Sequence, residues 1–229
     1  MGEIADNIAR IKERIYKRAI KVGRDPQTII LIGASKSVSI SYIKEAIAAG
    51  ISIFGENYVQ EAKEKISQIK EKVSWHMIGH LQKNKVKNAI SLFSMIQSVD
   101  SLELAREISV RAIKEGKIME ILIQVNVGEE RTKSGIKPLE LEGLLRDAST
   151  LKGIKVKGLM TIPPYFPEAE KGRPFFQKLR ELRDKLLPYC AGNISLEHLS
   201  MGMSGDFEVA IEEGATILRI GTAIFGERK

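Results

Sequence analysis

The sequence predicts a (β/α)8 barrel of the TIM type with one extra helix at its N-terminus. Two observations support this: eight apolar, strand-like runs alternate with helical patterns, and no linker or low-complexity tract interrupts them. A chain of 229 residues has the length of one such barrel. The alternative is a doubly wound open sheet, which the absence of a GxGxxG motif in the first strand-to-helix turn disfavours. We therefore expect residues 1–229 to form a single domain.

The strand-like runs are almost continuously apolar, which is typical of a parallel sheet covered on both faces. They lie at TIILIGAS (28–35), ISIFG (51–55), VSWHMIG (73–79), FSMIQSV (93–99), EILIQVNV (120–127), IKVKGLMTI (154–162), ISLEHLS (194–200) and ATILRIG (215–221).

Helical patterns lie before the first strand and between the others. The N-terminal segment has its apolar residues at the spacing of an amphipathic helix: Ile4, Ile8, Ile11, Ile15 and Ala19. The segment 41–50 ends in a glycine suited to a left-handed C-cap, and the segment 100–116 begins with an Asp100–Glu103 pair, a capping-box signature. Charges of both signs alternate through KEKISQIKEK (63–72) and FQKLRELRDKL (176–186), as they do on exposed helix faces.

Composition excludes several classes of protein. A hydrophobic share of 43% argues against a disordered chain, and no apolar run reaches the roughly 20 residues that span a bilayer. With one cysteine, Cys190, no intramolecular disulfide can form, so we expect a cytoplasmic protein. The net charge of +7 indicates a lysine-rich solvated surface or a small anionic ligand. Nucleic-acid binding is not expected, because the basic stretch LQKNKVKN (81–88) lacks interleaved aromatic residues.

A lysine stands at the end of the first strand. Ile30, Ile32, Ala34 and Lys36 share one face by the two-residue period of a strand. If that face lines the barrel, Lys36 enters the mouth at the carboxyl ends of the strands, where function concentrates in this fold. A lysine amine there can form an imine with an aldehyde. From its position alone, a surface lysine at a strand end is the competing interpretation.

Two turns late in the chain have residues that suit an anion-binding site. Arg219 lies among apolar residues of the last strand and needs partners if it is buried, and Gly221 and Thr222 follow it. The preceding strand ends in LSMGMSGD (199–206), whose glycines allow close backbone approach and whose hydroxyls can donate to an anion. The loops after strands seven and eight form the recurrent phosphate site of this fold. Together with Lys36 they indicate a phosphorylated aldehyde, with pyridoxal 5′-phosphate as the leading candidate.

These residues belong to stretches that resemble the pyridoxal phosphate homeostasis proteins, single-domain relatives of the alanine racemase barrel. The stretches cover nearly the whole chain in order: ASK (34–36), FGENYVQE (54–61), WHMIGHLQKNK (75–85), QSVDS (97–101), VNVGEERTKSG (126–135), GLMTIPP (158–164), LSMGMSGDFEVAIEEGAT (199–216) and RIGTAIFGER (219–228).

The resemblance implies a role for each matching position. Lys36 would carry the cofactor as an aldimine, and Arg219 would face the pyridine nitrogen. The phosphate would be held by Ser200 with the Met201 backbone, and by Gly221 with Thr222. Asn57 would lie near the ring or Lys36, and His80 with Lys83 would shape the mouth or bind a passing anion. The resemblance also implies a monomer without robust catalysis, which binds pyridoxal phosphate, delivers it to dependent apo-enzymes and balances cofactor and amino-acid pools.

Two other clusters were weighed as sites. His76 and His80 have the spacing of a helical metal site, but in a strand four residues span roughly 13 Å, so we predict no metal. Lys133 and Ser134 in EERTKSG (129–135) are either anion ligands or part of a solvated loop.

Three functions remain open at this stage. The chain is a cofactor carrier or regulator, a small amino-acid racemase, or a barrel that binds another phosphorylated ligand, as a Schiff-base aldolase does. An arginine at the ring nitrogen disfavours protonation of that nitrogen, and an unprotonated ring is a poorer electron sink. Racemisation also requires acid–base groups on both faces of the substrate, and in two-domain racemases a partner subunit supplies the second. We therefore expect a carrier with weak side activity.

Overall fold

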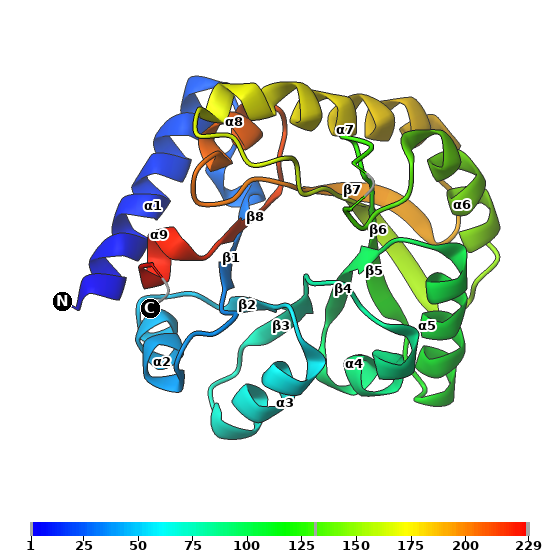
Figure 1. Cartoon of the computed structure of the whole chain (residues 1–229), viewed down its shortest axis with the longest axis horizontal. Coiled ribbons are helices and arrows are strands. Elements are labelled where there is room, and N and C mark those ends of the chain that lie inside the picture. Colours follow the sequence, from blue (N-terminus) through cyan, green and yellow to red (C-terminus); the bar gives the residue numbers. More distant parts are fainter. Residues whose placement is uncertain (1, 131, 228–229) are drawn as a thin grey trace.

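The computed structural model describes residues 2–130 and 132–227. Within them, eight parallel strands close a barrel in chain order (Figure 1), which confirms the predicted (β/α)8 fold. The strands are β1 (Ile30–Ala34), β2 (Ile53–Glu56), β3 (Ser74–Met77), β4 (Met95–Val99), β5 (Met119–Gln124), β6 (Ile154–Met160), β7 (Ile194–Ser200) and β8 (Ile217–Ile220). The helices are α1 (Glu3–Lys21), α2 (Ile40–Ala48), α3 (Val59–Gln68), α4 (Val86–Leu92), α5 (Leu102–Lys114), α6 (Leu141–Ala148), α7 (Arg173–Leu186), α8 (Phe207–Glu212) and α9 (Thr222–Phe225).

Closure of the barrel brings the two ends of the chain together. Strand β1 pairs with β8 from Ile30↔Ile217 to Gly33↔Ile220, so the segment after β1 lies beside the segment after β8. The interior of the barrel holds an apolar cluster of Ile32, Met95, Leu122, Met160 and Ile217. Ile32 therefore points inward, as the two-residue period predicted.

Helix α1 covers one side of the barrel, where it packs against α2, α8 and α9 (Figure 1). The five residues of its predicted apolar face are all buried. Ion pairs from Arg14 to Glu208 and from Arg18 to Glu212 join its polar edge to α8. The extra helix therefore joins the first helix after β1 to the helices that follow the last two strands.

The helix ends follow the sequence signals in part. Gly50 and Gly116 take positive φ angles of +84° and +68° after α2 and α5, as the C-cap prediction requires. The predicted cap of α5 is wrong by one residue: Ser101, rather than Asp100, accepts the hydrogen bond from Leu104 N–H at 3.2 Å. Asp100 contacts His80 instead, with 3.3 Å between its Oδ2 and the histidine Nδ1.

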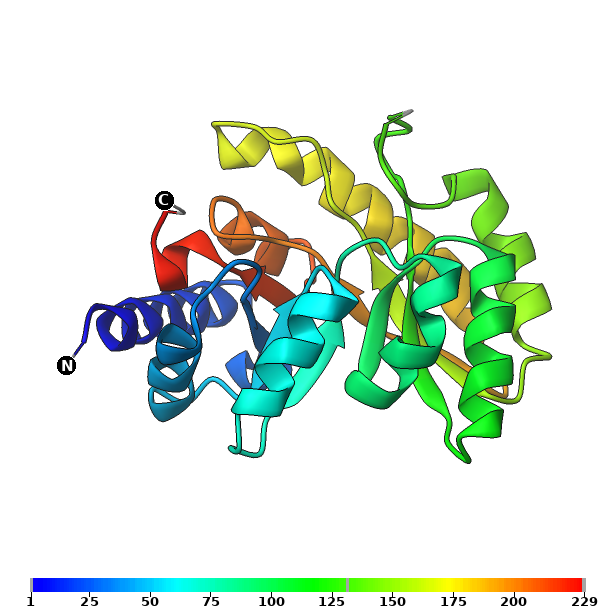
Figure 2. The same cartoon turned by 60° about the horizontal axis from the view of Figure 1, so that its bottom comes forward.

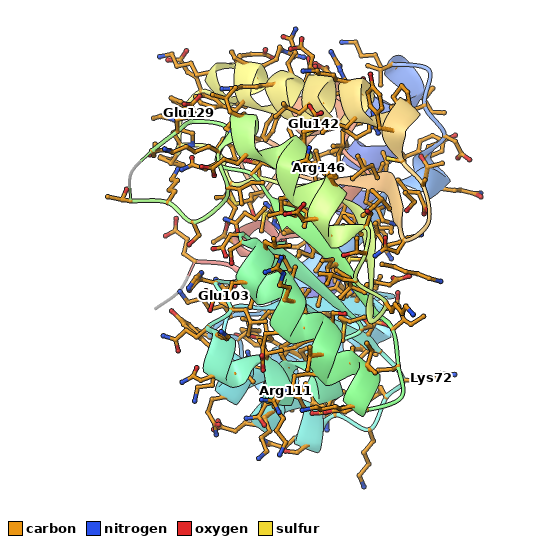
Figure 3. The ribbon with its side chains drawn as sticks, turned by 90° about the vertical axis from the view of Figure 1, so that its right-hand side faces the viewer. Lys72, Glu103, Arg111, Glu129, Glu142 and Arg146 are labelled. Carbon is orange, nitrogen blue, oxygen red and sulfur yellow. The ribbon has the colours of Figure 1, made fainter. Side chains whose placement is uncertain are left out.

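Most charged side chains lie on the outer faces of the helices. Figure 3 shows Glu103 and Arg111 on α5 beside Glu142 and Arg146 on α6, directed away from the barrel. The predicted exposed face of residues 63–72 is wrong at one position, because the side chain of Lys65 is only 8% exposed. None of the helices in the described ranges is both long and apolar enough to cross a membrane.

The connections after β5 and β6 project from the carboxyl ends of the strands. Figure 2 shows the segment between β5 and α6 and the start of α7 rising on the same side of the barrel. The strand ends, rather than the opposite rim, are thus surrounded by long loops, which is the side where sites occur in this fold.

Candidate functional site

A cavity of about 320 Å³ opens at the carboxyl ends of the strands. Its wall combines residues at the ends of six strands, among them Ala34, Asn57, Ile78, Pro164, Ser204 and Thr222. The volume lies at the lower end of the range for small-molecule sites, about 300–1,000 Å³. The position agrees with the mouth predicted from the strand phase.

Lys36 lies in the turn after β1 and is not among the residues that line this cavity. Ala34, two residues earlier on the same face, lines the cavity wall. The half-buried Lys36 side chain turns toward Tyr58, and its Nζ lies 5.3 Å from the centroid of that ring. The amine thus lies over an aromatic face, next to the loop that carries Asn57.

Arg219 lies within the barrel and also lines the cavity. Its guanidinium is 4% exposed and donates hydrogen bonds to Ser200 Oγ at 2.5 Å and to the Thr161 carbonyl at 2.8 Å. Burial lowers the pKa of Arg219 to about 10, and the nearby Asp206 carboxylate opposes that shift. The buried arginine is therefore paired, as expected, but with neutral acceptors.

Ser200 and Met201 are buried and are not among the residues that line the cavity. The Ser200 hydroxyl donates to Gln97 Oε1 at 2.7 Å, and the Gln97 amide nitrogen lies 2.9 Å from His76 Nδ1. The Met201 N–H donates to the Ile217 carbonyl at 3.2 Å. Strand β7 runs through Ser200, so this hydroxyl orients Arg219 and lies away from the cavity wall where the phosphate role would place it.

Ser204 is the hydroxyl that reaches the cavity from this loop. Its Oγ accepts a hydrogen bond from Ala223 N–H at 3.1 Å, which ties the loop after β7 to the segment after β8. Gly221 and Thr222 line the same wall. The sequence contains the signal, since Ser204 is one of the two hydroxyls of LSMGMSGD, but the resemblance implies Ser200 rather than Ser204 as the phosphate ligand.

Glycines bring these segments close to one another. Gly202 has a φ of +91°, and a Cβ there would lie 2.6 Å from the Cβ of Ala210. A Cβ on Gly79 would lie 2.4 Å from the Asn57 carbonyl oxygen, so only glycine lets the chain after β3 pack against Asn57. Asn57 is thereby held in the cavity wall.

The remaining predicted residues lie outside this cavity. His80 is exposed and contacts Asp100 and the Ser134 hydroxyl, the latter at 3.4 Å from its Nδ1. Lys83 pairs with Glu103 on α5, and Lys133 pairs with Glu130 at 2.8 Å. His76 is buried, and its burial, with a smaller contribution from His198, lowers its pKa to about 4. Ser134 thus contacts His80, and none of residues 126–130 and 132–135 lines the cavity.

Comparisons with known proteins agree with this geometry. The family model for the N-terminal domain of alanine racemase matches residues 2–229. The pyridoxal phosphate homeostasis protein of Aquifex aeolicus is 49% identical over 225 residues, covering 98% of each chain. That of Pseudomonas aeruginosa is 41% identical, covering 100% of this chain and 97% of the relative.

Solved structures give the same result. PipY of Synechococcus elongatus PCC7942 with pyridoxal phosphate bound superposes with a TM-score of 0.86 at 34% identity, covering 98% of this chain and all of that one. Alanine racemase of Clostridium difficile 630 shares the fold alone, with a TM-score of 0.71 at 16% identity over 97% of this chain and 57% of the racemase. The chain therefore belongs to the alanine racemase N-terminal domain family, among its pyridoxal phosphate homeostasis proteins.

Proposed function

We propose that this chain binds pyridoxal 5′-phosphate and acts in its homeostasis, as a carrier or regulator of the cofactor. The observation that carries the proposal is the composition of one cavity wall. A buried cation, Arg219, and two hydroxyls, Ser204 and Thr222, line a space of about 320 Å³. The same wall includes Ala34, two residues before Lys36. A phosphorylated aromatic aldehyde requires these groups: an anion site, a partner for its ring nitrogen and an amine.

Each residue has a distinct task in this proposal. The hydroxyls of Ser204 and Thr222, with the backbone at Gly221, hold the phosphate, and Asn57 borders the ring. Lys36 provides the amine that attaches the cofactor. Ser200 keeps Arg219 directed at the ring nitrogen through its 2.5 Å hydrogen bond. This assignment moves Ser200 from the phosphate to the arginine.

Arg219 also accounts for the low catalytic activity that we propose for this site. When bound, the cofactor supplies an aldehyde for attachment and a ring that withdraws electrons if its nitrogen is protonated. With a pKa of about 10, Arg219 keeps its own proton at neutral pH and donates toward the ring nitrogen instead of protonating it. The protein therefore holds the cofactor without robust catalysis, and any racemase-like activity is weak.

The proposal includes a location and an assembly. We propose that the protein works in the cytoplasm as a monomer and supplies the cofactor to apo-enzymes. Light scattering coupled to size exclusion measures the mass, and a dimer would contradict this part alone.

Borohydride reduction followed by intact-mass analysis tests the proposal directly. The wild-type protein mixed with pyridoxal phosphate should gain the mass of one reduced cofactor, on Lys36 by peptide mapping. Lys36→Ala should keep its fold and gain none. A wild-type protein that gains no mass, or that gains it on another lysine, contradicts the proposal. Racemisation assays on several amino acids separate the carrier from a racemase.

A further inference from the structure

A buried charged network lies directly behind the turn that carries Lys36. Lys65 Nζ on α3 donates to Glu56 Oε1 and to Glu61 Oε1, both at 2.7 Å. The Ser35 hydroxyl donates to the same Glu56 oxygen at 2.6 Å. Glu56 is fully buried, and its second oxygen, Oε2, has no partner among the residues that the structure describes. Three charged side chains, those of Glu56, Glu61 and Lys65, thus meet behind the turn that carries Lys36.

This network holds the backbone on both sides of Lys36. The Ser35 carbonyl, in the peptide before Lys36, accepts a hydrogen bond from Lys65 Nζ at 2.5 Å. The Ser37 N–H, in the peptide after Lys36, donates to Glu61 Oε1 at 2.5 Å. With both peptide groups fixed, the direction of the Cα–Cβ bond of Lys36 is fixed as well. Only the side-chain torsions of the lysine remain free.

The turn needs this support because of its backbone conformation. Ser37 has a φ of +60°, in the left-handed region that is unfavourable for a residue with a Cβ. The hydrogen bond from its N–H to the Glu61 carboxylate offsets that cost. The turn follows Ala34, which lines the cavity, and it carries the Lys36 side chain toward the Tyr58 ring.

Stability alone does not explain the choice of charged residues. A buried ion pair can often be replaced by apolar side chains of similar volume without loss of stability, since the desolvation cost offsets the attraction. Apolar side chains could fill this space, but they could not bond the Ser35 carbonyl and the Ser37 N–H. The polar groups are therefore explained by the two peptides that they hold.

We propose that Glu56, Glu61 and Lys65 are positioning residues that set the approach of the Lys36 amine to an aldehyde in the cavity. The inference rests on the proposed function, because it assigns these residues a role in attaching the cofactor at Lys36. They contact the backbone around Lys36 and act through it.

Glu61→Ala and Glu61→Gln test this role, with Glu64→Ala on the same helix as the matched control. Glu64 is exposed and accepts from Gln60 of α3. Binding is measured with two probes: pyridoxal 5′-phosphate, and pyridoxine 5′-phosphate, an alcohol that cannot react with an amine. Glu61→Ala should weaken pyridoxal phosphate about tenfold or more, as misplacement of a reacting group does, and leave pyridoxine phosphate unchanged.

The other outcomes separate the competing explanations. Glu61→Gln keeps an acceptor for the Ser37 N–H and should restore most of the affinity, and Glu64→Ala should behave as wild type. Equal losses for both probes with Glu61→Ala would show a merely structural role and overturn the inference. Repeating Glu61→Ala in a Lys36→Ala background should add no further loss. The borohydride adduct of the wild type is measured first, because its absence overturns the proposed function and this inference with it.

Discussion

Two cations are buried near the carboxyl ends of the strands, and the barrel neutralises them differently. Lys65 lies between two carboxylates, Glu56 and Glu61, at 2.7 Å from each. Arg219 bonds to a hydroxyl and a carbonyl, with no ion-pair partner among residues 2–130 and 132–227. The paired cation fixes a turn, whereas the cation left with neutral partners lines the cavity. Arg219 thus has no direct ion pair, and the nearby Asp206 carboxylate in the same cavity wall is the charge that opposes it, whereas Lys65 bonds directly to two carboxylates.

Loss of the paired cation should have the largest effect. Lys65→Met leaves the buried Glu56 carboxylate without its cation, beside the partly exposed Glu61. Breaking a buried pair costs about 3–5 kcal/mol of unfolding free energy. Urea denaturation followed by circular dichroism measures the change. Lys63→Met, at an exposed position of the same helix, is the control and should change little. A loss below 1 kcal/mol would place Lys65 with ordinary surface ion pairs.

The stability of the fold should depend on pH through His76. This histidine is the last member of the hydrogen-bonded chain that begins at Arg219. The pKa of His76 is about 4 in the folded protein, against about 6.5 in an unfolded chain. Between these values the unfolded state binds more protons, so stability rises with pH and the contribution is complete above about pH 6.5. Across this pH range, His76 should change the free energy of unfolding by about 3 kcal/mol.

His76→Gln should remove that part of the slope. Unfolding free energies of wild type and variant are compared across this window, where the contributions of the carboxylates cancel in the difference. His80→Gln replaces an exposed histidine and serves as the control. If the wild type and His76→Gln had the same pH dependence, His76 would bind its proton as readily in the folded as in the unfolded state, which would contradict the prediction.

Replacement of Arg219 should destabilise the fold less than replacement of Lys65. Arg219→Met leaves the Ser200 hydroxyl and the Thr161 carbonyl without a donor but leaves no carboxylate unpaired, so we expect a loss of about 1–3 kcal/mol. The same denaturation experiment ranks the two variants. A loss equal to that of Lys65→Met would mean that the two cations are neutralised alike, which would remove the basis of the comparison.

Ser200 at the end of β7 and Ser204 in the loop that follows should give the smallest effects. Ser204→Ala should lower the affinity for pyridoxal phosphate roughly tenfold through a lost hydrogen bond to a charged group, and should leave unphosphorylated pyridoxal nearly unchanged. Ser200→Ala should weaken both ligands alike, because it acts through Arg219. Calorimetric titration with the two ligands decides. A phosphate-selective loss in Ser200→Ala would restore the phosphate role to that residue.

The strand and helix pattern was predictable because it depends on local periodicity. Eight apolar runs, a five-residue apolar face in α1 and glycines at helix ends are readable without knowing what packs where. The phase of β1 also placed Ala34 in the cavity wall, whereas Lys36 lies in the turn beyond the end of the strand, where the two-residue period no longer applies. The position of the α5 cap was less predictable, because Asp100 and Ser101 both suit an N-cap, and a tertiary contact with His80 occupies the aspartate.

The sequence by itself determined the barrel, the family and the segments that meet at the mouth. Only the tertiary structure decided which side chains of those segments face the cavity. Ser200 pairs with Ile217 across β7 and β8 and is turned to Arg219, whereas Ser204 lies beyond that pairing and reaches the cavity. Lys65, in a stretch that resembles a solvated helix face, is buried because closure of the barrel places α3 behind the turn at Lys36. Periodicity reports whether a face is apolar, but a buried charge depends on partners brought from other strands.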